Sequence, residues 1–268
     1  MLSDLSLARR LERAEGLANA RFVEARARIS PESGAEWIEV GGAYAMYDGP
    51  HSPCTQTFAL GLFEETTAAH LDKLEAFFQE RGASVFHEIS PLADKALWPL
   101  LGRRGYRPVE FSSVMFLPLD GRQPVPPPWN ASIHARLAGP QERELWARTA
   151  AEGWREATGF SDVLPDLMRV TAAREDALSF LAELDGQAVA AGAMIVVNGV
   201  ALLAGASTIP QARHQGAQRA LLESRLRHAA EAGCELAMMC AEPGSGSQRN
   251  AERQGFRIAY TRVKWGVG

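Results

Sequence analysis

Residues 200–233 read VALLAGASTIPQARHQGAQRALLESRLRHAAEAG and combine an expected strand, turn and helix in one run. The apolar segment from Val200 to Thr208 is followed by Pro210, by a turn that contains Gly216, and then by helical periodicity. The first N–H groups of a helix lack intrahelical partners and carry the positive end of the helix dipole. A glycine-bearing turn that leads into a helix is therefore a predicted phosphate or pyrophosphate site.

The helix expected after this turn has an apolar stripe and a marked end. Gly233 stands where a left-handed C-terminal cap belongs. Arg213, at the start of the turn, would add a fixed positive charge to the phosphate site. The apolar residues that recur at helical spacing are Ala217, Ala220, Leu221, Leu226, Ala229 and Ala230.

The turn resembles the signature of the GNAT superfamily of acyl-CoA-dependent N-acyltransferases: Arg or Gln, two residues, Gly, one residue, then Gly or Ala. Arg213 and Gly216 match this signature, whereas Gln218 replaces its last small residue. A further strand and a Gly-Phe-Arg sequence at 255–257 follow in the order that the resemblance requires. The resemblance covers residues 130–268 and implies acyl transfer from acetyl-CoA, or another acyl-CoA, to an amine.

The resemblance also implies which residues contact the acyl-CoA. Backbone groups at the end of the strand would receive the pantetheine arm and polarise the thioester carbonyl, while the turn would bind the pyrophosphate. Two polar residues of the short helix before Gly255 are further candidates. The predicted cofactor-binding residues are Ala206, Ser207, Thr208, Arg213, His214, Gln215, Gly216, Ala217, Gln218, Ser247 and Asn250.

The proton-transfer groups are less clearly marked than the phosphate turn. Many relatives carry a tyrosine four residues before the Gly-Phe pair, and Ala251 occupies this position here. Tyr260 in the last strand is the candidate catalytic acid, and a partly buried structural tyrosine is the alternative. Glu152 and Asp162, in the helical region that borders the acceptor groove of relatives, are candidates for the base, and a water chain could serve instead.

The elements around the turn indicate an α+β fold. Strands are expected at 177–184, 187–197 and 200–208, joined by short turns, and helix-linked strands follow them. No charged residue occurs from Gly186 to Ala212, which is long enough to span a bilayer. The Asn-Gly dipeptide within this stretch favours a hairpin turn, so two buried strands are predicted instead of a membrane helix.

An internal repeat relates the two halves of the chain. Gly82 precedes a strand, a helix and Gly-Tyr-Arg, just as Gly233 precedes a strand, a helix and Gly-Phe-Arg. We therefore expect two GNAT-like halves, each a mixed, mostly antiparallel sheet flanked by helices. In the first half Glu64 and Glu65 precede the corresponding helix and would repel pyrophosphate. The predicted organisation is a degenerate GNAT-like domain without a phosphate loop at 1–120, a Pro-rich linker at 121–130 and a GNAT N-acetyltransferase domain at 131–268.

Composition narrows the choice of partners and location. A net charge of −4 and a pI of about 5.9 give no electrostatic reason to expect nucleic acid or an anionic membrane. Three cysteines and six dispersed histidines form neither a disulfide framework nor a metal site. Within the first sixteen residues, Arg9, Arg10, Glu12 and Arg13 stand where an export signal needs an apolar core, so a cytoplasmic location is expected.

The sequence favours a cytosolic N-acetyltransferase that transfers an acetyl group from acetyl-CoA to a small-molecule amine, without a metal. A non-catalytic acyl-CoA sensor or interaction module is the alternative, because the usual tyrosine is absent. A dinucleotide site is disfavoured, since no full glycine fingerprint follows an N-terminal strand. The acceptor is not identified by the sequence, and either a monomer or a homodimer is compatible with it.

Overall fold

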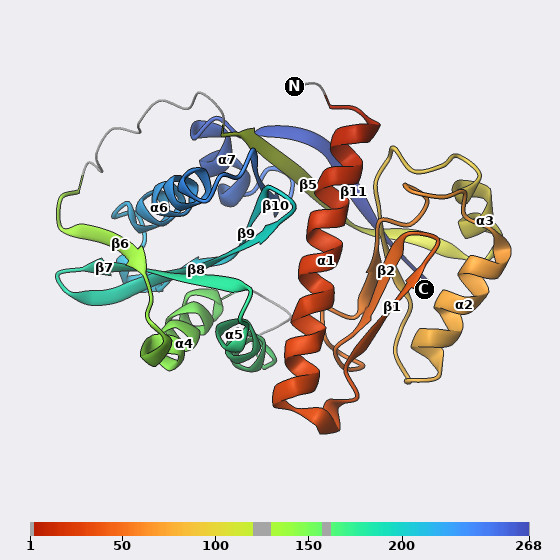
Figure 1. The fold of residues 1–268 in the computed structure, drawn as a ribbon, viewed down its shortest axis with the longest axis horizontal. Coiled ribbons are helices and arrows are strands. Elements are labelled where there is room, and N and C mark those ends of the chain that lie inside the picture. Colours follow the sequence, from red (N-terminus) through yellow and green to blue (C-terminus); the bar gives the residue numbers. More distant parts are fainter. Residues whose placement is uncertain (1–2, 120–129, 157–161, 268) are drawn as a thin grey trace. The chain divides into compact units, whose positions relative to one another are not determined.

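The computed structural model describes residues 3–119, 130–156 and 162–267 of the chain. The chain forms two compact units, one of Met1–Leu117 with Cys240–Gly268 and the other of Pro118–Met239. Each unit combines a mixed, mostly antiparallel sheet with flanking helices (Figure 1). This architecture confirms the predicted α+β fold.

The sheet of the first unit has the order β1, β2, β3, β4, β11, β5. Strands β3 and β4 run parallel, and all other neighbours in this sheet are antiparallel. Its strands are β1 (Glu36–Val40), β2 (Ala43–Tyr47), β3 (Gln56–Phe58), β4 (Phe86–Ile89), β5 (Tyr106–Pro118) and β11 (Arg257–Val267).

Helices cover both faces of this first sheet. The long helix α1 packs on β1 and β2 from one side, and α2 packs from the other (Figure 1). Apolar residues of α2, among them Leu71, Leu74 and Phe78, are fully buried in the core between this helix and the sheet. The helices of the unit are α1 (Leu5–Ile29), α2 (Ala68–Gln79), α3 (Leu97–Arg103), α7 (Gly246–Arg253) and the 3-10 turn Pro31–Ser33.

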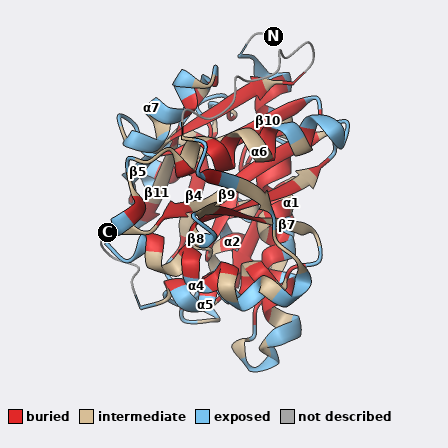
Figure 2. Cartoon of the chain, turned by 90° about the vertical axis from the view of Figure 1, so that its left-hand side faces the viewer, coloured by how far each residue is buried: buried red, intermediate tan, exposed pale blue. Residues whose placement is uncertain are grey.

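The sheet of the second unit has the order β10, β9, β8, β7, β6, with only β9 and β10 parallel. Helix α6 lies on one face, and α4 and α5 lie on the other (Figure 1). Buried residues follow the strands and the inner sides of the helices (Figure 2). The elements are β6 (Ile133–Leu137), α4 (Arg143–Trp154), α5 (Leu164–Ala173), β7 (Ala177–Leu184), β8 (Gln187–Val197), β9 (Val200–Thr208), α6 (Ala217–Glu231), β10 (Leu236–Ala241) and the 3-10 turns Pro140–Glu142 and Pro210–Ala212.

Two tight hairpins join β7, β8 and β9, as the sequence predicted. The turn residues Asp185, Gly186, Asn198 and Gly199 all have positive φ, the backbone form required by two-residue type I′ turns. The uncharged stretch from Gly186 to Ala212 thus forms the two strands β8 and β9, as predicted, instead of a helix. Within the described residues, no helix has both the length and the apolar character needed to cross a membrane.

The internal repeat is visible in the backbone. Gly82 and Gly233 both adopt the left-handed conformation directly after α2 and α6, and each precedes a strand. Gly105 and Gly255 do the same after α3 and α7. Because left-handed conformations are accessible to glycine without a Cβ penalty, these four positions explain the sequence spacing that revealed the repeat.

The division of the chain differs from the predicted boundary at the C-terminal end. The sequence analysis placed residues 131–268 in one domain, whereas residues 240–268 group with the first unit. The reason is strand pairing: β11 inserts between β4 and β5 and pairs antiparallel with both. The predicted linker at 121–130 lies outside the described residues except for Asn130.

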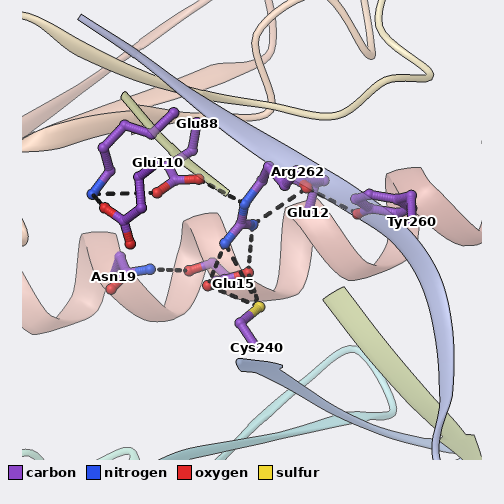
Figure 3. A network of polar contacts seen from close by, with 9 residues as sticks. Glu12, Glu15, Asn19, Glu88, Glu110, Cys240, Tyr260 and Arg262 are labelled. Atoms are coloured by element: carbon purple, nitrogen blue, oxygen red, sulfur yellow. Dashed lines mark hydrogen bonds and ion pairs between the residues drawn. The ribbon is translucent and has the colours of Figure 1, made fainter. Parts of the chain in front are cut away.

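A buried charged network attaches β11 to the rest of the first unit (Figure 3). Arg262 pairs with Glu15 at 2.7 Å, with Glu88 at 3.0 Å and with Glu12 at 3.3 Å. Tyr260 donates its hydroxyl to Glu12 at 2.8 Å. Helix α1, β4 and β11 are therefore joined through one arginine whose removal would leave several buried carboxylates unpaired.

The network holds more carboxylates than Arg262 can neutralise. Burial, followed by the neighbouring Glu15 charge, raises the pKa of Glu12 to about 7, although Arg262 acts in the opposite direction. Burial also raises the pKa of the Cys240 thiol, which lies 3.3 Å from Glu15. Cys234 and Cys240 are free thiols.

Candidate functional site

The end of β9 departs from regular strand geometry. In its pairing with β8, Ser207 faces Ala191 and Ala204 faces Ala193, so two residues of β9 stand opposite Gly192 alone. One of the two, Gly205, has a φ of 61°. This is a β-bulge, which leaves one residue of the ladder unpaired and redirects the backbone groups beside it.

The opposite edge of β9 is open along the same segment. In the register between the described residues of β9 and β10, the parallel pairing joins Val200–Leu202 to Leu236–Met238. This pairing ends at Leu202. From Leu203 to Thr208 the strand is therefore held by β8 but not by β10. An extended ligand can hydrogen-bond to such an edge through main-chain groups.

The turn after β9 brings the chain into α6 through two left-handed residues. The 3-10 turn Pro210–Ala212 ends at Arg213, which is extended. His214 then has a φ of 64° and Gly216 a φ of 97°. Asn130 steadies the turn, because its side-chain amide donates to the Gln215 carbonyl at 3.2 Å. The sequence-predicted turn is thus well formed.

The start of α6 has no side-chain cap. Gly216 is the N-cap residue, and the helix hydrogen bonds begin with Ala220 N–H donating to the Gly216 carbonyl at 3.0 Å. The N–H groups of Ala217, Gln218 and Arg219 precede this bond and have no acceptor within the helix. These donors and the positive end of the helix dipole make the α6 start suitable for an anion. A pyrophosphate fits this donor set.

Arg213 lies beside the turn and is partly exposed. Its Nε donates to the Thr208 carbonyl at 3.4 Å and its Nη2 to the Gly153 carbonyl at 3.3 Å. The same guanidinium pairs with Glu156. Arg213 therefore ties β9 to the end of α4 and presents a positive charge at the edge of the turn.

Helix α4 lies very close to the end of β9. A Cβ built on Gly153 would be 2.9 Å from the Thr208 nitrogen and still closer to the Ser207 side chain, so a glycine is required there. Ser207 donates its hydroxyl to the Ala150 carbonyl at 2.8 Å. Gln218 donates its amide to the Thr208 hydroxyl at 2.8 Å. Because both side chains are engaged, Ser207 and Thr208 offer mainly backbone groups to a ligand.

Most of the predicted cofactor-binding residues fall on one continuous segment. It comprises the bulge, the turn and the first residues of α6, namely Ala206, Ser207, Thr208, Arg213, His214, Gln215, Gly216, Ala217 and Gln218. Ser247 and Asn250 lie in α7, in the part of the chain that groups with the first unit. The structure therefore assembles the predicted phosphate turn within the second unit alone.

Tyr260 has a structural place in β11. Its hydroxyl is buried and donates to Glu12, and burial raises the pKa of this hydroxyl well above its usual value. The geometry corresponds to the alternative role of a buried strand tyrosine. Ala251, at the position of the tyrosine found in many relatives, is fully buried in α7.

The two acidic residues considered as bases lie on either side of a segment outside the described residues. Glu152 is half-buried in α4 and pairs with Arg155 at 3.2 Å. Asp162 is exposed just before α5. Neither side chain is shown in contact with the β9 bulge, and the proton acceptor stays a prediction.

Three features of the site were missed in the sequence. Glu156 neutralises part of the Arg213 charge, Gly153 allows the approach of α4, and Gly192 faces the bulge. A glycine inside a helical pattern can indicate a close backbone approach, so Gly153 carried a usable signal. The contacts of Glu156 and Gly192 join segments that are distant in the sequence. No local sequence pattern predicts such contacts.

Residues 132–243 match the family model described as "Acetyltransferase (GNAT) domain". This segment is similar to a GNAT acetyltransferase domain. It contains the β9 bulge, the phosphate turn and all of α6. Acyl transfer from an acyl-CoA is the general chemistry of GNAT acetyltransferases.

Several solved GNAT structures align with most or all of this chain. A GCN5-related N-acetyltransferase from Kribbella flavida aligns with a TM-score of 0.65 and 19% identity over 92% of this chain and 95% of that protein. One from Sphaerobacter thermophilus aligns with a TM-score of 0.62 and 21% identity over 84% and 76%. A tandem GNAT protein from the clavulanic acid biosynthesis pathway aligns with a TM-score of 0.60 and 12% identity over 100% and 97%. Among curated proteins, none matches.

These likenesses establish the fold and its duplication. The neighbour with two GNAT domains covers both halves of this chain, in agreement with the internal repeat. The chain is therefore an α+β protein of two GNAT-like halves, as the sequence predicted. Their low identity leaves the substrates to be inferred from the residues of the site.

Proposed function

We propose that the protein is an N-acetyltransferase that transfers an acetyl group from acetyl-CoA to the amine of a small molecule. The observation that carries this proposal is the open start of α6 directly after a bulged strand with a free edge. The α6 N–H groups and Arg213 would hold the pyrophosphate, and the edge of β9 would hold the pantetheine arm. Acetyl-CoA supplies the activated acyl group.

The residues around the thioester would act by position and polarity. Backbone N–H groups at the Gly205–Ala206 bulge would polarise the thioester carbonyl. Holding the acyl donor and the amine together would remove much of the entropic barrier to their reaction. A thiol titrates near pH 8.5, so thiolate is an acceptable leaving group near neutral pH, and the chemistry tolerates Ala251 in place of a tyrosine.

A non-catalytic acyl-CoA sensor is the second candidate. Two observations favour it: Ala251 cannot donate a proton, and the hydroxyl of Tyr260 is already bonded to Glu12. A sensor and an enzyme would share the same phosphate turn. Turnover therefore distinguishes them, whereas binding does not.

Calorimetric titration with acetyl-CoA, followed by thiol release across a panel of amines, tests the proposal. The informative variant is Arg213→Ala with Gly216→Glu, which removes one positive charge and adds a carboxylate at the helix start. Arg227→Ala is the matched control, since it removes an equal charge from an exposed position further along α6. We expect tight binding to the wild type and to the control, no binding to the double variant, and amine-dependent thiol release.

The other results have definite meanings. Binding without thiol release from any amine would favour the sensor. Equal binding to the wild type and the double variant would place the acyl-CoA somewhere other than the α6 start. Absence of binding to the wild type would refute both candidate functions.

A further inference from the structure

Arg225 is a buried cation in α6 that the proposed acyl-CoA contacts leave unexplained. The residue is only 3% exposed. Burial lowers the pKa of its guanidinium to about 10, and no carboxylate of the described residues raises it again. The side chain is therefore charged near neutral pH without a counter-ion, which is a costly arrangement in a protein interior. Met or Leu would pack in such a place without this cost.

The contacts of Arg225 point to the β-bulge. Its Nη1 donates to the Ala193 carbonyl of β8 at 3.2 Å, and its Nε donates to the Leu221 carbonyl of its own helix at 3.3 Å. A Cβ built on Gly192 would lie 3.2 Å from both Cζ and Nη1 of Arg225 and 3.5 Å from the Ala206 Cβ. The guanidinium thus lies over Gly192, the residue that the bulge of β9 faces.

Strand β8 is held from its other face at the same position. Trp146 of α4 is fully buried, and its indole Nε1 donates to the Gly192 carbonyl at 3.1 Å. Arg225 and Trp146 therefore fix neighbouring carbonyls of β8 from opposite faces. A bulge is a locally irregular part of a ladder, so its shape depends on how firmly the facing strand is held.

We propose that Arg225 is a positioning residue for acyl transfer. Its guanidinium, packed over Gly192 and bound to the Ala193 carbonyl, holds the Gly205–Ala206 bulge in the form that presents backbone groups to the thioester. This inference rests on the proposed function. In this role the buried guanidinium fixes the backbone around the thioester carbonyl. The pyrophosphate contacts at the α6 start do not depend on Arg225.

The test separates chemistry from binding and from stability. Arg225→Met keeps the length of the side chain but removes its donors, Arg225→Lys retains one donor group, and Leu226→Ala is a packing control on the same helix. For each variant, kcat and KM for acetyl-CoA are measured with an amine that the wild type accepts, together with the Tm.

We expect Arg225→Met to lower kcat at least about tenfold, because a small misplacement of groups at the reacting carbonyl is costly. KM for acetyl-CoA should change by less than about twofold, since an interaction specific to the transition state affects kcat and not ground-state binding. Arg225→Lys should recover part of the lost kcat. Leu226→Ala should lower the Tm and leave kcat at the wild-type value.

Gly192→Ala provides an independent variant if Arg225→Met does not fold. The added methyl group would press on the guanidinium, which has to shift by a few tenths of an ångström, so kcat should fall while the affinity for acetyl-CoA is retained. A folded Arg225→Met or Gly192→Ala variant with wild-type kcat would overturn this inference alone. A wild-type protein that transfers no acyl group would overturn the proposed function as well.

Discussion

Helices α2 and α6 have corresponding places in the two halves, but their first turns are built differently. Each helix connects two parallel neighbours, β3 with β4 and β9 with β10. The start of α2 is closed by a capping box, in which Thr67 accepts from His70 N–H and His70 Nδ1 accepts from Thr67 N–H. The start of α6 has Gly216 and no side-chain cap. The shared topology alone is therefore insufficient for an anion site.

The segment before α2 is also packed against other residues of the first half. Leu60 and Leu62 are buried, and the Gly61 carbonyl between them accepts a hydrogen bond from Asp94 N–H at 2.8 Å. Glu64 and Glu65 then bring negative charge toward the helix start. In the second half, the corresponding strand end is open along one edge. In the first half, internal contacts therefore occupy the place that corresponds to this open edge.

Moving the α2 cap onto α6 should have the largest effect. The variant Gly216→Thr with Arg219→His places the capping residues of α2 at the start of α6, where their side chains would occupy the N–H groups of residues 216 and 219. Gly216 also has a φ of 97°, which a threonine adopts only with strain. We expect the Kd for acetyl-CoA to rise at least about 100-fold, or about 3 kcal/mol, as measured by calorimetry.

Arg219→His alone is the control for this transplant, because it makes the same change of charge but adds no hydroxyl at the N-cap position 216. Its affinity for acetyl-CoA should stay within about tenfold of the wild type, which corresponds to about 1.4 kcal/mol. Wild-type affinity in the double variant would show that the open helix start is not what distinguishes the two halves.

Each half also buries a basic residue that has no ion-pair partner among the described residues, His87 in the first half and Arg225 in the second. His87 in β4 is fully buried without a hydrogen-bond partner among the described residues, and burial lowers its pKa to about 3. Below pH 6.5 the unfolded chain binds a proton that the folded His87 refuses, so the contribution of His87 to stability falls by up to about 1.4 kcal/mol per pH unit as the pH decreases from 6.5 toward 3. The raised pKa of Glu12 contributes in the opposite direction between about pH 7 and 4.5. The His87 contribution is therefore measured as the difference between wild type and His87→Phe in urea unfolding between pH 7 and 4.

His87→Phe should remove this contribution, since a phenyl ring has no proton to gain. As the pH is lowered over the same range, the unfolding free energy of the variant should rise relative to that of the wild type. Arg225→Met should leave that slope unchanged, because the Arg225 guanidinium stays protonated across it. Equal slopes for wild type and His87→Phe would mean that His87 is protonated in the folded protein.

Removing the cap of α2 should have the smallest effect. Thr67→Ala deletes the hydroxyl that accepts from His70 N–H, and loss of such a cap costs about 1 kcal/mol of unfolding free energy. Thermal or urea unfolding would measure it. Affinity for acetyl-CoA should be unchanged, so a weakened affinity in this variant would contradict the assignment of binding to α6.

The fold of the second half was predictable because its signals are local. The Asp185-Gly186 and Asn198-Gly199 turns and the apolar strands between them define β7, β8 and β9 without reference to distant residues. Helix α1 was missed because its buried face carries Glu12, Glu15 and Arg26, which hide the apolar stripe. The short strands β1–β3 were missed too.

Longer-range features were beyond the sequence patterns. Nothing near Arg257–Val267 indicates that this strand pairs between β4 and β5, because the pairing depends on residues far away in the chain. The phosphate turn was predicted from Arg213 and Gly216, whereas the contact of Arg225 with Gly192 spans two elements and has no motif. Local sequence thus predicted the turn and the uncapped helix start, and only the structure showed which distant residues pack beside them.

The most direct test of the account is an NMR titration of the wild-type protein with acetyl-CoA that follows the backbone amides of both helix starts. We predict large shifts for the amides of Gly216, Ala217 and Gln218, with those of Thr67 and His70 unchanged. Shifts centred on the start of α2, or shifts that leave the α6 amides in place, would contradict the claim that the uncapped helix start is the acyl-CoA site.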